Sequence, residues 1–197
     1  GVPFLLHDAT LERTTSGQGI AGEHSWAGLS RLDAGHWHSR RYAGEGIPTL
    51  EAVSRWCRAN GVLLNIEIKP TPGQETETGQ VVAGEAARLW QGAAVPPLLS
   101  SFQVEALRAA QAAAPQLPRA LLLDRLWGGW QAQAHALAVV ALVCNHALWD
   151  EALVAQARAA GWRMLSYTVN DEWAAQRLWA LGTDGIITDR VDLFAPD

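Results

Sequence analysis

Apolar and polar residues alternate in one short stretch of the chain, which runs from Asn65 through Ile66, Glu67 and Ile68 to Lys69. Successive side chains of a β-strand point to opposite faces, so the pattern predicts a strand with both isoleucines on one face. The polar face then carries a carboxylate and an ammonium group near the carboxyl end of the strand. Two interpretations stay open for this pair, an internal ion pair that fixes the register or a functional site.

Downstream of this stretch, short apolar runs alternate with amphipathic runs. Short apolar runs bounded by turn residues predict strands, and apolar residues spaced three and four apart predict helices. The expected strands are 62–69, 98–102, 119–124, 140–145, 163–169 and 185–188, and the expected helices are 79–91, 103–113, 129–137, 150–160 and 171–181. Strand–helix alternation with short connections indicates an α/β fold with a parallel sheet and right-handed crossovers.

The N-terminal part of the chain is less regular. Residues 2–6 are apolar and predict a further strand, which stops at His7 and Asp8. Residues 9–46 contain many Gly, Thr and Ser residues without a clear period, which indicates a small insertion made mostly of loops. A capped helix is expected over about 49–60.

Polar or functional side chains stand at the carboxyl ends of nearly all the expected strands. In a doubly wound sheet such groups gather at one or two switch points, whereas in a closed barrel they all face one mouth. The even spread favours a barrel, but the strands are fewer than the usual eight. Either the first units are missing from the chain or the sheet is open, and the abrupt start favours missing units. The groups at the strand ends are Glu67, Lys69, Ser101, Phe102, Asp124, Asn145, Thr168, Asn170 and Asp189.

Composition narrows the possible functions. The 197 residues suit a single domain, and a chain that is 49% hydrophobic can form a core. A net charge of -5 without a Lys/Arg block argues against nucleic-acid binding, and no apolar run approaches the roughly 20 residues of a membrane helix. Cys57 and Cys144 fit a reducing compartment as small core residues. We expect the ten tryptophans to lie mainly in the core, with Trp37 as a possible wall of a pocket.

Six motifs follow one another in a characteristic order. They are Leu5-Leu6-His7-Asp8 with Leu11-Glu12-Arg13-Thr14-Thr15, then Ile47-Pro48-Thr49-Leu50-Glu51, Asn65-Ile66-Glu67-Ile68-Lys69-Pro70, Ser100-Ser101-Phe102, Tyr167-Thr168-Val169-Asn170 and Gly185-Ile186-Ile187-Thr188-Asp189. Each motif is weak alone. Their order and spacing over nearly the whole chain resemble the glycerophosphodiester phosphodiesterase family, in its soluble bacterial type.

The resemblance implies a (β/α)8 barrel that hydrolyses glycerophosphodiesters such as glycerophosphocholine to sn-glycerol 3-phosphate and an alcohol. It also implies a divalent cation, Mg²⁺ or Ca²⁺, and two histidines as general acid and base. His7 matches the second of these histidines, with Asp8 as a structural neighbour. Glu67 matches a metal ligand of the family, and Lys69 matches the lysine beside the phosphate.

The chain departs from the family at its start. The family's His-Arg-Gly and Pro-Glu-Asn motifs and its Glu-x-Asp pair do not occur in the 197 residues. The resemblance therefore implies one partial barrel domain over 1–197 that lacks the first strand–helix unit and the second strand and is inactive alone. The alternative is a truncated, non-catalytic barrel that binds a glycerophosphate or a partner without turnover. The presence of His7, Glu67 and Lys69 argues against it.

The remaining expectations concern the mouth of the barrel and the loops. Phe102, Asn145 and Asn170 are candidate substrate-binding residues, although core packing is an equal interpretation for Phe102. Glu12 and Arg13 are expected to pair locally, and His36 and His38 are expected to be surface residues. The substrate is a small glycerophosphodiester. The resemblance indicates the bacterial cytoplasm and leaves the periplasm open, and the oligomeric state is undetermined.

Overall fold

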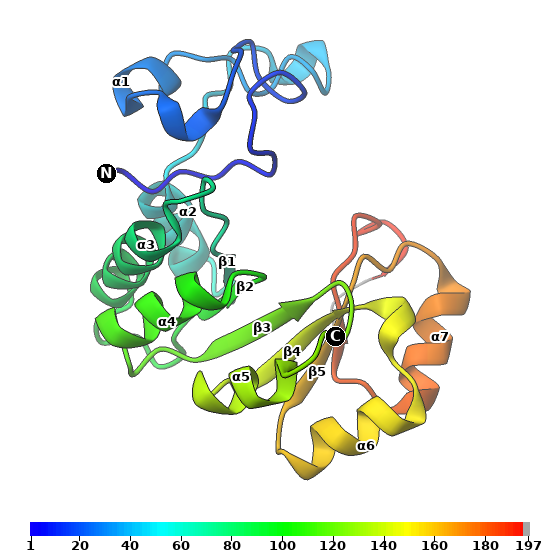
Figure 1. Cartoon of the computed structure of the whole chain (residues 1–197). Coiled ribbons are helices and arrows are strands. Elements are labelled where there is room, and N and C mark those ends of the chain that lie inside the picture. The colour runs from blue at the N-terminus through cyan, green and yellow to red at the C-terminus, as the bar shows by residue number, and fades with distance from the viewer. Residues whose placement is uncertain (195–197) are drawn as a thin grey trace.

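A computed structural model describes residues 1–194. Six parallel strands form one sheet in which each strand pairs with the next along the chain. The strands are β1 (Asn65–Glu67), β2 (Leu98–Ser101), β3 (Arg119–Leu123), β4 (Ala141–Asn145), β5 (Arg163–Tyr167) and β6 (Gly185–Ile186). The expected parallel α/β sheet is confirmed, and the sheet curls as it does in a barrel (Figure 1).

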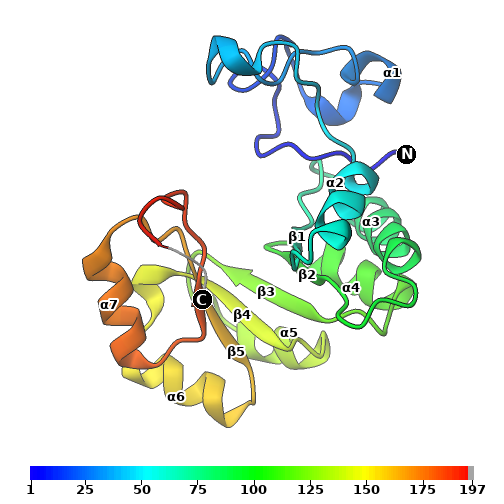
Figure 2. The same ribbon diagram turned by 180° about the vertical axis from the view of Figure 1, so that it is seen from behind.

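Helices connect the strands and cover one side of the sheet. Helices α2, α3 and α4 lie beside β1 and β2, whereas α5, α6 and α7 lie around β3 to β5 (Figures 1 and 2). The helices are α1 (Trp26–Leu29), α2 (Leu50–Ala59), α3 (Glu75–Leu89), α4 (Val104–Ala113), α5 (Trp130–Ala136), α6 (Glu151–Ala159) and α7 (Glu172–Leu181), with short 3-10 helices η1 (Ala21–Glu23), η2 (Arg40–Tyr42) and η3 (His146–Leu148).

The two faces of the sheet carry different side chains. On the covered face Leu121, Leu142 and Met164 are buried in the main core, together with residues of α4 to α7. On the opposite face Leu122 and Val143 form a smaller apolar cluster of their own. Side chains two residues apart on a strand point to the same face. The polar groups that end or follow β3 and β4, Asp124 and Asn145, therefore lie on the same face as Leu122 and Val143.

Strand β1 has the predicted faces. Ile66 and Ile68 are buried in a core cluster shared with α2, α3 and α4, whereas Asn65, Glu67 and Lys69 are exposed. The strand begins three residues later than expected, at Asn65. The preceding segment instead completes the turn after α2, since the Val62 amide donates to the Cys57 carbonyl at 2.9 Å.

The expected strand at residues 2–6 does not join the sheet. Phe4 forms a single antiparallel bridge with Thr49, and the Leu5 amide donates to the Pro48 carbonyl at 2.9 Å. Within residues 1–194 strand β1 pairs only with β2, so the sheet offers this segment no parallel neighbour. Its backbone groups bond with the chain that enters α2 instead. The prediction of a seventh parallel strand before His7 is therefore wrong for this structure.

Residues 9–46 form loops and very short helices around a small core of their own. Leu11, Ala21 and Leu29 are buried there together with Ile47, the residue that directly follows the segment. The segment extends away from the sheet at the N-terminal end of the molecule (Figure 1). This arrangement agrees with the irregular insertion that the composition of residues 9–46 predicts.

The tryptophans are less buried than expected. Trp90 and Trp162 lie in the core, but Trp56, Trp173 and Trp179 are 61%, 73% and 53% exposed. The apolar side of an amphipathic helix spans only part of its circumference, so a tryptophan on a helix can still point to solvent. Core packing is therefore the wrong interpretation for these three.

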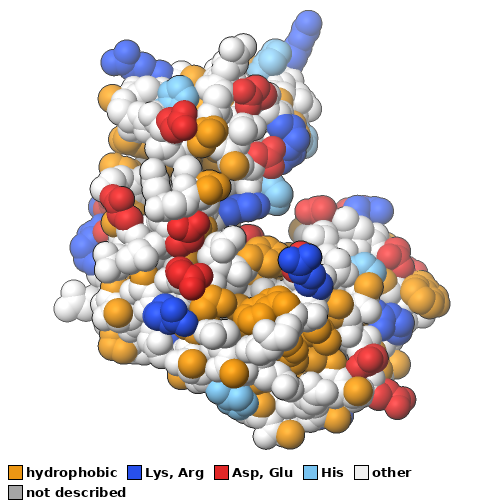
Figure 3. Space-filling model, in the orientation of Figure 1, with side chains coloured by type: hydrophobic (Ala, Val, Ile, Leu, Met, Phe, Trp, Pro, Cys, Tyr) orange, Lys and Arg blue, Asp and Glu red, His pale blue; other side chains and the backbone are white. Residues whose placement is uncertain are grey.

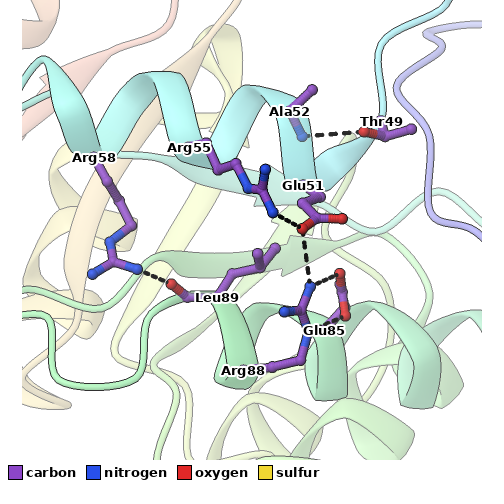
Figure 4. A network of polar contacts seen from close by, with 8 residues as sticks. All are labelled: Thr49, Glu51, Ala52, Arg55, Arg58, Glu85, Arg88 and Leu89. Atoms are coloured by element: carbon purple, nitrogen blue, oxygen red, sulfur yellow. Dashed lines mark hydrogen bonds and ion pairs between the residues drawn. The ribbon is translucent and has the colours of Figure 1, made fainter.

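Polar contacts fix α2 against α3 (Figure 4). The Thr49 hydroxyl accepts from the Ala52 amide at 3.1 Å and caps α2, as the sequence predicts. Glu51 pairs with Arg55 at 2.6 Å and with Arg88 of α3 at 3.6 Å. These side chains are substantially exposed, so the ion pairs contribute little to stability and mainly orient the two helices.

Helices α3 and α4 approach most closely at Gly79. A Cβ atom at this position would lie 2.2 Å from the Ala106 carbonyl oxygen, whereas one at Gly84 of the same helix would meet nothing within 4 Å. Gly79→Ala is expected to destabilise the fold by about 1–3 kcal/mol through overpacking. Gly84→Ala is expected to stabilise it by about 0.5–1 kcal/mol, since alanine is the better helix former. Urea denaturation of both variants measures the difference, and equal effects would contradict the close approach.

Candidate active site

The carboxyl ends of the parallel strands meet at one edge of the sheet, where barrel enzymes carry their chemistry. Glu67 ends β1, Asn145 ends β4 and Tyr167 ends β5. Phe102 and Asp124 directly follow β2 and β3. The register pairs Glu67 with Ser100 and Asn145 with Tyr167, so the strand ends stay level with one another. The fold thus brings most of the predicted residues to the same edge.

Glu67 and Lys69 lie on the exposed face of the segment that begins with β1. The chain between them is held firmly, because the Ile68 amide donates to the Ser100 carbonyl at 2.6 Å and the Ser101 hydroxyl donates to the Ile68 carbonyl at 2.6 Å. Among residues 1–194 no salt bridge joins Glu67 to Lys69. The ion-pair interpretation is therefore not borne out, and both charges remain available to a ligand.

His7 is oriented by its neighbour Asp8. The His7 Nδ1 atom lies 2.7 Å from the Asp8 Oδ1 atom, and the Arg13 guanidinium binds the same carboxylate at 2.5 and 2.9 Å. Hydrogen bonds from Arg13 and then His7 hold the pKa of Asp8 well below its usual range. An ionised carboxylate only accepts hydrogen bonds, so Nδ1 of His7 carries the proton. The Nε2 atom is left for proton exchange, and the side chain is 74% exposed.

The loop after His7 is paired differently from the prediction. Arg13 binds Asp8 rather than Glu12, and the Glu12 carboxylate accepts from the Gly19 amide at 2.7 Å. This hydrogen bond is the main cause that lowers the pKa of Glu12. The prediction of a Glu12–Arg13 pair used only the opposite charges of two adjacent residues. In the structure the turn at 9–20 brings the Gly19 amide to the Glu12 carboxylate instead. The expected Glu12–Arg13 pair is wrong.

An aromatic pair stands at the same edge. The rings of Phe102 and Tyr167 meet edge to face with their centroids 5.7 Å apart. Their strands are three positions apart in the sheet, which would separate flat backbones by about 14 Å. The contact therefore depends on the curl of the sheet. Phe102 is 39% exposed, so it does not have the buried position of a core residue.

Tyr167 is the site residue that sequence reasoning missed. Its hydroxyl donates to the Leu123 carbonyl at 3.1 Å, and burial raises its pKa to about 12. The signal was present, since Tyr167 belongs to a motif that carries the family resemblance and ends a strand as the other site residues do. Only the curl of the sheet, however, shows that it meets Phe102.

The two asparagines at this edge take part in loop structure. The Asn145 side-chain oxygen accepts from the Ala147 amide at 3.0 Å and caps η3. The Asn170 side-chain oxygen accepts from the Asp189 amide and from the Thr188 hydroxyl, and its amide group donates to the Asp189 carboxylate at 3.1 Å. These bonds tie the segment after β5 to the last loop. A role of either asparagine in substrate binding stays a prediction.

Comparison with known proteins gives these residues a context. The sequence profile of the Glycerophosphoryl diester phosphodiesterase family matches residues 1–193. The chain belongs to this family. The resemblance seen in the motifs is thereby confirmed, and with it the assignment to a class of enzymes.

Family relatives match nearly the whole chain. A glycerophosphodiester phosphodiesterase of Caldanaerobacter subterraneus is 30% identical over 194 residues, which cover 94% of this chain and 75% of the relative. The solved structure of an Oleispira antarctica phosphodiesterase in complex with the product sn-glycerol 3-phosphate is 32% identical, with a TM-score of 0.86 over 95% of this chain and 76% of that one. A glycerophosphodiester phosphodiesterase structure from Agrobacterium tumefaciens is 26% identical, with a TM-score of 0.79 over 99% and 81% of the two chains.

The family implies a divalent cation, and such an ion needs several oxygen ligands around it. Glu67 is an exposed carboxylate at the carboxyl edge of the sheet. However, residues 1–194 contain no group of three or more His, Cys, Asp or Glu side chains that could hold a metal ion. His36 and His38 are exposed, and His38 packs against Trp37 and Tyr42. The described residues therefore do not form a complete metal site.

The residues that belong to the family motifs do not all lie at one place. Glu67, Lys69, Phe102 and Tyr167 gather at the sheet edge, whereas His7 stands in the loop that leads to the insertion. No hydrogen bond or salt bridge links His7 to Glu67 or Lys69 in the described part of the chain. Figure 3 shows a notch between the N-terminal block and the C-terminal block, with hydrophobic side chains gathered beside it.

In the part of the chain that the structure describes, no helix has the length and apolarity needed to cross a membrane.

Proposed function

We propose that this family member hydrolyses glycerophosphodiesters, such as glycerophosphocholine, to sn-glycerol 3-phosphate and an alcohol. The observation that carries the proposal is the product sn-glycerol 3-phosphate in the Oleispira antarctica structure, to which 95% of this chain is similar. The exposed His7, Glu67 and Lys69 supply the chemistry that this reaction needs. A non-catalytic barrel would have no reason to keep all three.

His7 serves as a general acid–base group in this proposal. Asp8 holds its Nδ1–H group at 2.7 Å, so the Nε2 atom accepts a proton from the attacking hydroxyl or returns one to the leaving alcohol. The nucleophile is water or the glycerol hydroxyl of the substrate. Its oxygen forms a new bond to phosphorus, and the bond from phosphorus to the head-group oxygen breaks. Where the glycerol hydroxyl attacks, the first product is a cyclic phosphate, and water then opens the ring by adding its oxygen to phosphorus and a proton to the glycerol oxygen. The alcohol leaves with the proton it needs.

Lys69 provides positive charge for the phosphate. Its ammonium group is exposed at the sheet edge and has no carboxylate partner within residues 1–194, so it can bind a non-bridging phosphate oxygen. That oxygen gains negative charge as the nucleophile attacks, and a fixed cation lowers the barrier to this step.

Glu67 is proposed as a ligand of a divalent cation. A carboxylate offers the hard oxygen atom that Mg²⁺ and Ca²⁺ prefer, and the cation would offset phosphate charge. One carboxylate does not make a complete site for either ion. The cation requirement rests on the family.

The substrate is proposed to bind along the carboxyl edge of the sheet. Phe102, Asn145 and Asn170 are proposed to contact it beside Lys69.

We propose the bacterial cytoplasm as the location of the protein, with the periplasm as the alternative, because its motifs resemble the soluble bacterial type.

An enzyme-coupled assay for sn-glycerol 3-phosphate tests the proposal. The natural protein that carries this sequence is incubated with glycerophosphocholine, first with added Mg²⁺ or Ca²⁺ and then with a chelator. Release of sn-glycerol 3-phosphate only in the presence of a cation is the expected result. Activity that survives the chelator would contradict the cation requirement, and binding of glycerophosphocholine without any product would favour the non-catalytic alternative.

A further inference from the structure

Arg13 spends two of its nitrogen atoms on a single carboxylate. Its Nε atom donates to Asp8 Oδ2 at 2.5 Å, and its Nη2 atom donates to Asp8 Oδ1 at 2.9 Å. The same Oδ1 atom accepts the Nδ1–H group of His7 at 2.7 Å. A guanidinium that binds both oxygens fixes the plane of the carboxylate, whereas a single hydrogen bond would let it rotate. The orientation of the histidine partner is therefore set by an arginine five residues further along the chain.

The turn at 9–20 holds the backbone of Arg13 in place. Leu11 is buried in the small core of the insertion, and its amide donates to the Gly19 carbonyl at 3.0 Å. The Glu12 carboxylate closes the same turn by accepting from the Gly19 amide at 2.7 Å. The two residues before Arg13 are thus anchored, so its long side chain extends toward the carboxylate from a fixed starting point.

The contact of Arg13 with Asp8 contributes little to stability. The two side chains are 55% and 25% exposed, and ion pairs at such positions stabilise a fold only weakly. The contact constrains His7 instead. Within residues 1–194 the only hydrogen bond of the His7 side chain is the one to Asp8, and an exposed imidazole turns freely unless one of its nitrogen atoms is held.

We propose that Arg13 is a positioning residue for the acid–base chemistry of His7. It acts through Asp8: by locking the carboxylate it keeps the proton of the neutral imidazole on Nδ1 and leaves Nε2 free to accept a proton. The first turn of the insertion thereby contributes to the reaction without contacting the substrate. This inference rests on the proposed function, because it concerns the histidine that exchanges a proton there.

Two other roles for Arg13 predict different results. A guanidinium that bound the substrate phosphate would act on KM, because its charge would be felt in the bound substrate. A purely structural ion pair would act on the unfolding midpoint and leave kcat unchanged. A positioning residue acts on kcat, since it alters only the fraction of histidines that are correctly oriented for proton exchange.

The kinetic test uses Arg13→Gln in the natural protein that carries this sequence. With glycerophosphocholine, kcat is expected to fall about tenfold, a part of the contribution of the whole acid–base group, while KM stays within about twofold. Arg13→Lys supplies a point charge without the fork and is expected to recover only part of the loss. Arg31→Gln is the matched control, since Arg31 is an exposed residue of the same insertion without a salt bridge in residues 1–194. A raised KM at unchanged kcat, or a lowered unfolding midpoint at unchanged kcat, would overturn the proposal.

A double-mutant cycle tests whether Arg13 acts through Asp8. Asp8→Ala removes the carboxylate, so the arginine then has nothing to hold. Adding Arg13→Gln to Asp8→Ala is expected to change kcat by less than about twofold, although the same substitution costs about tenfold in the unmodified protein. Losses that multiply in the double variant would show an independent action of Arg13 and would contradict the proposal.

Nuclear magnetic resonance of the histidine nitrogens gives a readout that needs no turnover. The resonances of His7 are assigned by their loss in His7→Ala. In the unmodified protein above the titration of the imidazole, the proton is expected on Nδ1, and in Arg13→Gln it is expected to be shared with Nε2. If no diester is hydrolysed but the tautomer changes in this way, the proposed function fails and the positioning role stands. If diesters are hydrolysed while the tautomer and kcat are the same in both proteins, the function stands and the positioning role is wrong.

Discussion

His7→Ala is expected to lower kcat for glycerophosphocholine by about 10²–10⁴, the usual contribution of a general acid–base group. The side chain is 74% exposed and makes its Nδ1 contact with Asp8, so its loss leaves no cavity and should not change the unfolding midpoint. KM is expected to change much less than kcat, because the group acts on the proton and not on the phosphate charge. Steady-state kinetics with a thermal unfolding curve for the same sample measures both.

The histidine prediction has a close control in the insertion. His36 is also exposed, and the structure gives it no part in the proposed chemistry. His36→Ala is expected to leave kcat unchanged. Asp8→Asn tests the orienting contact, since it removes the acceptor charge beside Nδ1 and should lower kcat by a smaller factor than His7→Ala. Equal activity of the His7→Ala variant and the unmodified protein would remove His7 from the mechanism.

Glu67→Gln is the second variant with a large expected effect, a loss of turnover of at least about a hundredfold. The glutamine has the same length and shape, and Glu67 is exposed on β1, so the fold should be retained. What is lost is the negative charge that a hard divalent cation prefers. The cation concentration needed for half-maximal activity is therefore expected to rise, and Glu67→Asp, which keeps the charge, should recover part of the activity.

Cation binding gives this prediction a readout that is independent of turnover. A calorimetric titration of the natural protein that carries this sequence with Mn²⁺ should show weaker binding in its Glu67→Gln variant than in the unmodified protein. Glu105→Gln, an exposed change on helix α4, serves as the control for charge. Unchanged Mn²⁺ affinity together with unchanged turnover would exclude Glu67 from the site.

Much of the fold is predictable from local pattern. The alternation around Glu67 placed Ile66 and Ile68 inside and the polar residues outside, because a strand has a fixed two-residue period. Strand–helix alternation was sufficient to predict parallel neighbours in sequence order. The polar groups at the strand ends follow from the same order, since parallel strands end at one edge.

Other features depend on contacts that no local pattern contains. The Asp8–Arg13 pair forms across a loop without periodicity, so adjacency suggested Glu12 as the wrong partner. The Phe102–Tyr167 contact requires the curl of the sheet. The segment before His7 is apolar as a strand should be, yet it pairs with the start of α2 because the sheet offers it no neighbour in the described residues. Strand propensity is realised only where a partner strand is present.

We propose that Lys69, Glu67 and His7 act on one phosphodiester at the carboxyl edge of the sheet. A crystal structure of the natural protein with sn-glycerol 3-phosphate and a divalent cation would show whether they do. We expect a phosphate oxygen within hydrogen-bond distance of the Lys69 Nζ atom, a cation bound to a Glu67 oxygen, and the His7 Nε2 atom facing the phosphate. Product bound elsewhere, with Lys69 and His7 both turned to solvent, would contradict it.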